Sequence, residues 1–287
     1  MDKKIKLIVS DLDGTLLNNA KRISDFTEKT LLDYQRQGYL VVLASGRFQK
    51  EIMRYSDQLK LKEFNGWIVC SNGYEVCNLA KQQVHTFDAI EAKQANDIYR
   101  IAEAYKLVQY VKINDIYHLK ISTLTKAFLN IGRGILEMAQ SMGLEKGLYA
   151  THLLKETVIT KKLDINTNVY KMAFVSTPKK LERFCEQVDK MFPNTYSFYY
   201  VNSVSVEITR NTVSKKNAVE YICEQLKLDI SQVIAFGDSG NDEPLLLNAG
   251  IGITMKNGTK RALAKAVHVS DLSNDQDGVA HECIKYL

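Results

Sequence analysis

Two carboxylates near the N-terminus, Asp11 and Asp13, have the spacing best suited to chemistry in this chain. They follow the apolar run at residues 5–9 and precede Gly14, so we expect them where a buried strand ends and the chain turns. Two acids held there repel each other and lose hydration, and a bound Mg²⁺ would offset both costs. Taken alone, an ordinary strand-to-turn signal explains the same residues equally well.

Three further apolar runs end in polar segments, at residues 45–47, 72–73 and 237–242. Parallel strands place their carboxyl ends along one edge of a sheet, and ligands bind at that edge in open α/β folds. We therefore expect the three segments to gather beside Asp11 and Asp13.

Asp238 and Asp242 would bring two more carboxylates to that edge. Without a counter-charge the acids would raise one another's pKa values and destabilise the fold, so a divalent cation with oxygen ligands fits the set. The alternative is a polar loop that begins the next helix, with Asp242 and Glu243 favourably placed near the N-terminus of that helix.

Ser45 and Lys215 offer groups that can bind a phosphate. Ser45 precedes Gly46, so its hydroxyl and nearby backbone N–H groups could hold a phosphate oxygen, although a Ser-Gly pair is also a common turn. Lys215 follows the expected N-cap Ser214, where a positive charge opposes the helix dipole. A lysine that faces the acids would offset their charge and bind a phosphoryl group, whereas an exposed lysine would do neither.

These residue types favour phosphoryl transfer through a carboxylate of the chain. Asp11 would attack phosphorus and form an aspartyl-phosphate, while Asp13 would protonate the leaving alcohol and then activate water. Mg²⁺, held by Asp11, the backbone carbonyl of Asp13 and Asp238, would neutralise the developing charge. Ser45 and Lys215 would bind the transferring oxygens.

The elements that must position these residues alternate between strand-like and helix-like patterns in residues 1–83 and 209–287, which predicts βαβ units and a parallel sheet. Residues 84–208 instead predict an α+β layer with hairpins. The patterns there are strand pairs at 108–121 and 197–208 and helical stretches at about 125–142 and 178–192. We expect an α/β fold with a Rossmann-like core, residues 1–83 and 209–287, and an inserted cap domain, residues 84–208.

Bulk composition narrows the classes of function. The 287 residues are 45% hydrophobic and 25% charged, as in ordinary globular proteins, and the net charge of +5 comes without a basic cluster suited to nucleic acid. No apolar run approaches the roughly 18 residues that span a membrane, and the N-terminus lacks a signal-peptide pattern. The five cysteines match no metal spacing, which predicts reduced thiols and a cytoplasmic location.

The motifs resemble those of the haloacid dehalogenase superfamily, and specifically its Cof-like group of bacterial sugar-phosphate phosphatases. DLDGTLL resembles the first motif, ASGR the second, VSK the third and GDSGND the fourth, and their order and spacing also match. The long gap between Arg47 and Ser214 would hold the inserted α/β cap of that group. The resemblance covers essentially the whole chain, including SNDQDGVA near its end.

The resemblance implies a role for each matched residue. Asp11 would be the nucleophile and Asp13 the acid/base, and both would share Mg²⁺ with Asp238. The phosphate-binding positions would be Leu12, Ser45, Gly46, Lys215 and Asn241, with Asn72 and Asp242 in supporting positions. The chain departs from the family at Lys216, Tyr74 and the segment MKNGT, which bears on substrate preference rather than on the chemistry.

We therefore expect a Mg²⁺-dependent phosphatase that acts on small phosphorylated metabolites, such as sugar phosphates or similar phosphomonoesters. It would act as a monomer or weak homodimer, with no nucleic-acid or membrane partner. A phosphomutase is an alternative, because it shares the aspartyl-phosphate but returns the phosphoryl group to the sugar. A signalling module is a further alternative, and both the inserted domain and Asp13, which promotes turnover, argue against it. A phosphate-binding protein without turnover is disfavoured because all the expected catalytic positions are filled.

Overall fold

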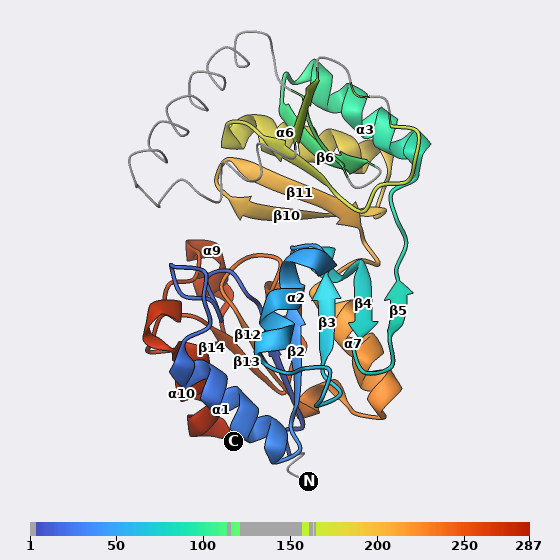
Figure 1. The fold of residues 1–287 in the computed structure, drawn as a ribbon. Coiled ribbons are helices and arrows are strands. Elements are labelled where there is room, and N and C mark those ends of the chain that lie inside the picture. The colour runs from blue at the N-terminus through green and yellow to red at the C-terminus, as the bar shows by residue number, and fades with distance from the viewer. Residues whose placement is uncertain (1–3, 114–115, 121–156, 161–162, 164) are drawn as a thin grey trace, which may run out of the picture. The chain divides into compact units, whose positions relative to one another are not determined.

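The structure is a computed structural model, and it describes residues 4–113, 116–120, 157–160, 163 and 165–287. The chain forms two compact units (Figure 1): a core unit, Met1–Asp88 with Thr212–Leu287, and an inserted unit, Ala89–Asn211. These bounds differ by a few residues from the expected 83/84 and 208/209. The first bound lies later because β5 (Gln83–Thr86) pairs with β4 in the sheet of the core unit.

A largely parallel sheet forms the centre of the core unit, with strand order β14-β13-β12-β1-β2-β3-β4-β5. Its other strands are β1 (Leu7–Ser10), β2 (Leu40–Ala44), β3 (Trp67–Cys70), β4 (Glu75–Asn78), β12 (Val233–Gly237), β13 (Ile251–Thr254) and β14 (His268–Val269). Among the described strand pairs of this sheet, only β3–β4 and β4–β5 are antiparallel. The central strand β1 pairs Leu7 with both Val233 and Leu40. The expected α/β fold with a parallel core is therefore confirmed.

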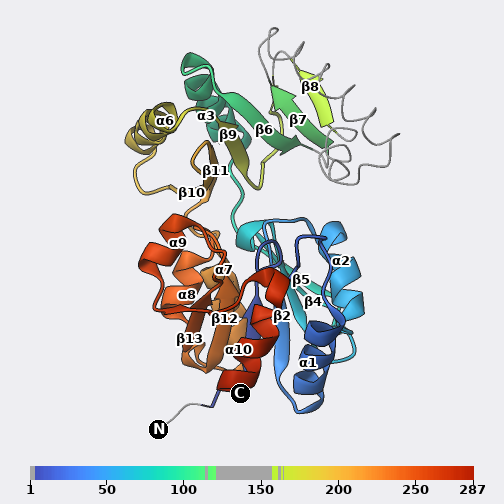
Figure 2. The same ribbon diagram turned by 90° about the vertical axis from the view of Figure 1, so that its left-hand side faces the viewer.

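Helices cover both faces of this sheet (Figure 2). Ile8 packs in one apolar cluster with Leu31 and Ile52 of α1 and α2, whereas Val9 packs in another with Val219 of α7. Burial on both faces explains why the strands are continuous apolar runs rather than alternating ones. The helices are α1 (Asp25–Arg36), α2 (Gln49–Gln58), α7 (Lys215–Leu226), α8 (Glu243–Asn248), α9 (Lys260–Lys265) and α10 (Gly278–Tyr286), with short turns η1 (Ser71–Gly73), η3 (Ile230–Gln232) and η4 (Asn274–Gln276).

Serine side chains begin two of these helices, as their sequence positions predict. The Ser24 hydroxyl accepts a hydrogen bond from the Thr27 N–H at 3.0 Å at the start of α1. The Ser214 hydroxyl does the same for the Asn217 N–H at 3.0 Å at the start of α7. Each bond satisfies one of the N–H groups that have no partner within the helix. The cap at Ser214 makes Lys215 the first helical residue.

The inserted unit is an α+β layer with its own core. Its sheet has the order β10-β11-β9-β6-β7-β8, and its strands are β6 (Val108–Ile113), β7 (Ile116–Lys120), β8 (Thr157–Thr160), β9 (Met172–Val175), β10 (Tyr196–Asn202) and β11 (Ser205–Arg210). Phe174 of β9 packs with Ile98 of α3 (Ala92–Ala104) and Phe184 of α6 (Pro178–Met191). Both expected hairpins are present as β6–β7 and β10–β11. The helix expected at about 125–142 lies outside the described residues.

No helix within the described ranges combines the length and the apolar character needed to cross a membrane.

Candidate active site

The carboxyl ends of β1, β2, β3 and β12 carry the predicted site residues on loops of the core unit. Asp11, Leu12 and Asp13 follow β1, Ser45 and Gly46 follow β2, Asn72 lies in η1 after β3, and Asp238, Asn241 and Asp242 follow β12. Lys215 does not follow a strand but is the first residue of α7. Parallel topology thus brings residues from distant parts of the chain to one edge of the sheet.

Lys215 is buried between two carboxylates. Its Nζ donates to Asp11 Oδ1 and to Asp242 Oδ1, each at 2.5 Å, and its side chain is only 1% exposed. Burial alone would lower the pKa of Lys215, but the charges of Asp11 and Asp242 raise it above its usual value. Lys215 is therefore a fixed positive charge that faces the acids instead of solvent.

Asp242 links Lys215 to the loop after β12. Its Oδ1 accepts from Lys215, and its Oδ2 accepts from the backbone N–H groups of Asp238 and Ser239 at 3.1 and 3.0 Å. Both carboxylate oxygens are thus engaged by the protein itself. The arrangement fits a positioning role for Asp242, which holds the lysine and shapes the loop.

Asp11, Asp238 and Asp242 place one carboxylate oxygen each within 4.8 Å of one another. Burial, with a contribution from Asp242, raises the pKa of Asp11 to about 7 despite the nearby Lys215. Burial and the charges of Asp11 and Asp242 raise the pKa of Asp238 to about 8. Because Asp242 is already engaged, Asp11 and Asp238 are the side chains best suited to hold a hard divalent cation such as Mg²⁺.

Asp13 lies outside this acidic cluster. Arg47 donates to its two carboxylate oxygens at 2.6 and 2.7 Å, and Lys21 Nζ donates at 2.6 Å. Burial would raise the pKa of Asp13, but the hydrogen bonds from Arg47 and Lys21 lower it below its usual value. The side chain is therefore an ionised carboxylate in this arrangement. The expected contact of its backbone carbonyl with the cation stays a prediction.

Two glycines permit the close approach of these loops. A Cβ on Gly14, whose φ is +80°, would lie 2.6 Å from a carboxylate oxygen of Asp238. A Cβ on Gly73, whose φ is +106°, would lie 2.2 Å from the backbone oxygen of Ser214. Glycine is required at both positions by backbone conformation and by space. The first brings the β1 loop against the β12 loop, and the second brings the β3 loop against the start of α7.

Asparagine side chains connect the loops further. Asn241 Nδ2 donates to Asn72 Oδ1 at 2.9 Å, and the Ser239 hydroxyl donates to Asn241 Oδ1 at 2.5 Å. The Asn72 N–H donates to the Ser45 carbonyl at 3.0 Å, and Asn72 adopts a φ of 61°. Gly46 lies beside Asn72, because a Cβ on Gly46 would come within 2.8 Å of its side-chain oxygen. The loops after three strands are thus joined by direct hydrogen bonds.

Sequence reasoning assigned no role to Arg47, Lys21 or Thr15, although the structure places all three in the site. The Thr15 hydroxyl donates to Asp238 Oδ1 at 3.4 Å. Arg47 stands in a polar segment that the sequence did single out, so its position was a usable signal. Lys21 carries no comparable signal, because a single lysine in a turn is common.

Comparisons with known proteins identify the family of this chain. A family model described as haloacid dehalogenase-like hydrolase matches residues 8–282. The chain is 26% identical over 300 residues to the phosphatase YwpJ of Bacillus subtilis, covering 96% of this chain and 98% of the relative. A crystal structure of a haloacid dehalogenase-like hydrolase from Bacteroides thetaiotaomicron is 26% identical with a TM-score of 0.73, and the match covers 99% of this chain and 100% of that one. A similar hydrolase from Bacillus subtilis shares the fold at 24% identity with a TM-score of 0.78, covering 99% and 100% of the two chains.

Proposed function

This chain belongs to the haloacid dehalogenase-like hydrolases and is a phosphatase, and we propose that it hydrolyses small phosphorylated metabolites with Mg²⁺ through an aspartyl-phosphate. The observation that carries the proposal is the buried Lys215 between Asp11 and Asp242. A buried lysine that faces acids at a sheet edge supports binding of an anionic group there.

Asp11 is the nucleophile in this proposal. Lys215 holds Asp11 Oδ1, so we assign the attack on phosphorus to Oδ2. The new Oδ2–P bond forms as the ester P–O bond breaks, and the leaving oxygen takes a proton from Asp13. Water then attacks phosphorus, gives a proton to Asp13 and releases inorganic phosphate with Asp11 restored.

Asp11, Asp238 and the backbone carbonyl of Asp13 would hold Mg²⁺. The raised pKa values of Asp11 and Asp238 support a cation at this position, because a positive charge would stabilise their ionised forms. When bound, Mg²⁺ would neutralise charge on the transferring phosphoryl group. Ser45, Gly46, Asn241 and the backbone of Leu12 would contact the remaining phosphoryl oxygens, with Asn72 holding Asn241 in place.

Asp13 must change partners to act as the acid. Its ion pairs with Arg47 and Lys21 favour the ionised form, whereas the first step needs a proton on Asp13. We propose that Asp13 leaves these two cations when substrate binds and returns to them after turnover. The pairing would keep Asp13 from protonating at other times.

The inserted unit, Ala89–Asn211, would select the substrate, with sugar phosphates or similar phosphomonoesters as the class. The proposal also has the enzyme act in the cytoplasm, as a monomer or weak homodimer. Five buried free cysteines suit a reducing compartment.

Replacement of the proposed nucleophile tests the function. Asp11→Asn keeps the size of the side chain and its ability to accept from Lys215, but it removes the attacking carboxylate. We expect hydrolysis of p-nitrophenyl phosphate with Mg²⁺ to fall by about 1,000-fold or more. The matched control is Asp33→Asn on the surface of α1, where the carboxylate pairs only with Arg36 among the ion pairs of the described residues. Activity close to that of the unaltered enzyme in Asp11→Asn would refute the assignment.

A further inference from the structure

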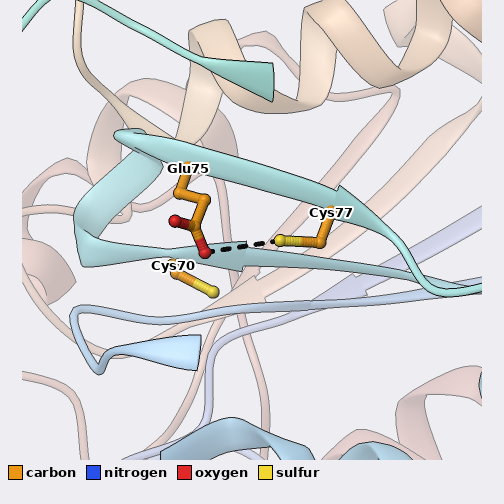
Figure 3. Close-up of side chains that lie close together, drawn as sticks. All are labelled: Cys70, Glu75 and Cys77. Carbon is orange, nitrogen blue, oxygen red and sulfur yellow. Dashed lines mark hydrogen bonds between the residues drawn. The ribbon is translucent and has the colours of Figure 1, made fainter. Parts of the chain in front are cut away.

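A second group of side chains that could bind a metal ion shares no residue with the active site. Cys70 ends β3, and Glu75 and Cys77 lie on β4. The two sulfur atoms and a Glu75 carboxylate oxygen all lie within 4.8 Å of one another. Figure 3 shows the three side chains gathered at the β3–β4 pair. We propose that Cys70, Glu75 and Cys77, here called the thiol cluster, form a Zn²⁺ site.

Strand register brings the thiol cluster together. Cys70 lies opposite Glu75 in the antiparallel pair, and Ile68 lies opposite Cys77. Alternate residues of a strand point to the same face, so all three ligands project from one side of the sheet. The Cys77 thiol donates to Glu75 Oε1 at 3.4 Å, which already orients the carboxylate toward the sulfur.

The donor atoms suit zinc in type and in separation. Zinc binds thiolate sulfur at about 2.3 Å and carboxylate oxygen at about 2.0–2.2 Å in tetrahedral sites, so its ligand atoms lie roughly 3.5 Å apart. The donor atoms of the thiol cluster lie within 4.8 Å of one another, so reaching that value needs each separation to shorten by no more than about 1.3 Å. Two thiolates and one carboxylate leave a fourth position for water. Sulfur donors also favour Zn²⁺ over Mg²⁺. The oxygen donors of the active site favour Mg²⁺ instead.

The three side chains of the thiol cluster differ in their exposure to solvent. Cys70 and Cys77 are 1% and 2% exposed and lie in an apolar cluster of the core unit, whereas Glu75 is partly exposed. The carboxylate therefore offers the route by which a cation reaches the sulfurs. Both cysteines are free thiols. Zinc binding should then release two thiol protons to the buffer.

A disulfide is the obvious alternative use of these two cysteines, and the register disfavours it. Cys70 and Cys77 are diagonal neighbours, because each lies opposite a different residue. Diagonal pairs in a sheet are separated by about 7–8 Å between Cα atoms, whereas disulfides usually need about 4.4–6.8 Å. A metal ion can bridge the longer diagonal. The six residues between the cysteines match no common zinc spacing, so the sequence-based expectation of no cysteine metal site is revised by this proposal.

Titration with Co²⁺ as a spectroscopic substitute for Zn²⁺ tests the proposal on the full chain. The protein is first saturated with Mg²⁺ under reducing conditions, so that oxygen sites are occupied. We expect one equivalent of Co²⁺ to give a thiolate-to-cobalt charge-transfer band with release of two protons per chain, and Zn²⁺ to abolish that band by displacing the cobalt without further proton release. Absence of the band in the unaltered protein would overturn the proposal, whatever the variants do.

Variants assign the band to the thiol cluster. Cys70→Ser and Cys77→Ser should each weaken Co²⁺ binding by at least tenfold, and Glu75→Gln should weaken it while keeping the two-thiolate band. Cys223→Ser, which changes a buried thiol of α7, and Asp238→Asn, which changes the acidic cluster, should leave the band intact. A band that survives Cys70→Ser and Cys77→Ser together, or that disappears in Cys223→Ser, would contradict the assignment. These results do not depend on phosphatase activity, so failure of one proposal leaves the other standing.

Discussion

Asp11 and Asp13 are two residues apart, yet the structure gives them opposite electrostatic surroundings. Asp11 is buried beside two other acids, and its pKa rises to about 7. Asp13 is 39% exposed on its side chain and paired with two cations, and its pKa falls below the usual value. Pairs of acids whose surroundings push their pKa values apart are a common basis for separate catalytic roles. In our account, Asp11 is the nucleophile and Asp13 is the proton carrier, and both roles need a change of surroundings: Mg²⁺ would favour the ionised form of Asp11, and Asp13 must leave Arg47 and Lys21 to carry a proton.

Replacement of the buried Lys215, which pairs with Asp11, should have the largest effect on both activity and stability. Lys215→Met keeps the length of the side chain but leaves Asp11 and Asp242 without their shared cation. We expect kcat to fall by about 100–1,000-fold, and the free energy of unfolding to fall by about 3–5 kcal/mol, because a buried charge is left unpaired. Steady-state kinetics and urea unfolding measure the two effects.

Lys216→Met is the matched control, because this neighbouring lysine pairs with Glu220 on α7. It should change both quantities little. Equal losses of kcat and of the free energy of unfolding in the two variants would contradict the proposed role of Lys215 as the buried partner of Asp11 and Asp242.

Removal of the proton carrier should lower activity and spare the fold. Asp13→Asn keeps one oxygen that can accept a hydrogen bond from Arg47, but it cannot take up or release a proton. We expect kcat/KM for an alkyl phosphate, which reports the steps up to formation of the aspartyl-phosphate, to fall by about 100–10,000-fold. The loss should be smaller for p-nitrophenyl phosphate, whose leaving group needs no proton. A loss of the same size for both substrates would contradict the role of Asp13 as an acid.

The acidic cluster should make the metal-free protein less stable as pH rises. The pKa of Asp238 is raised in the folded protein, so its contribution to stability is present near pH 4 and is lost as pH rises through about 8. Asp238→Asn should therefore increase the free energy of unfolding in EDTA at pH 8 by at least about 1 kcal/mol, which raises the melting temperature by about 2–4 °C. At pH 5 the gain should be much smaller.

In Mg²⁺ at pH 8, the unaltered protein should have a higher melting temperature than Asp238→Asn, the reverse of the order in EDTA. The reason is that Mg²⁺ stabilises the ionised Asp238 of the unaltered chain. Melting curves in EDTA and in Mg²⁺ measure this difference. A gain for Asp238→Asn that is equal at pH 5 and pH 8 would show that burial of its charge is not the cause.

Replacement of Lys21, the exposed partner of Asp13, should have the smallest effect on stability and activity. Lys21 is 38% exposed on its side chain, so its ion pair with Asp13 is screened by water. Lys21→Ala should lower the free energy of unfolding by less than about 1 kcal/mol, and added salt should reduce the difference. It should also raise the pKa of Asp13, which moves the pH dependence of kcat/KM toward higher pH. A pH profile identical to that of the unaltered enzyme would show that Lys21 does not influence the protonation of Asp13 during catalysis.

The sequence predicted the fold and the gathering of the site because both follow from local patterns. Apolar runs that end in polar segments mark β1, β2 and β12, and parallel topology then places Asp11, Ser45 and Asp238 at one edge. The partners of Asp13 could not be predicted in this way. Its contact with Arg47 depends on how two loops fold toward each other, and no periodic pattern records that.

The thiol cluster was missed for a related reason. Cys70 and Cys77 meet only because η1 sets the register of β3 and β4, and a shift of one residue would put the two thiols on opposite faces. The sequence shows the spacing of the cysteines but not that register.

Trapping the phosphorylated enzyme tests the central claim about Asp11 most directly. The Asp13→Asn variant, supplied with radiolabelled substrate and Mg²⁺ and then quenched in acid, should retain a phosphoryl label that hydroxylamine removes. Peptide mapping should place this label on Asp11, and Asp11→Asn should show none. Rapid turnover with no labelled enzyme, or a label on another residue, would contradict the account.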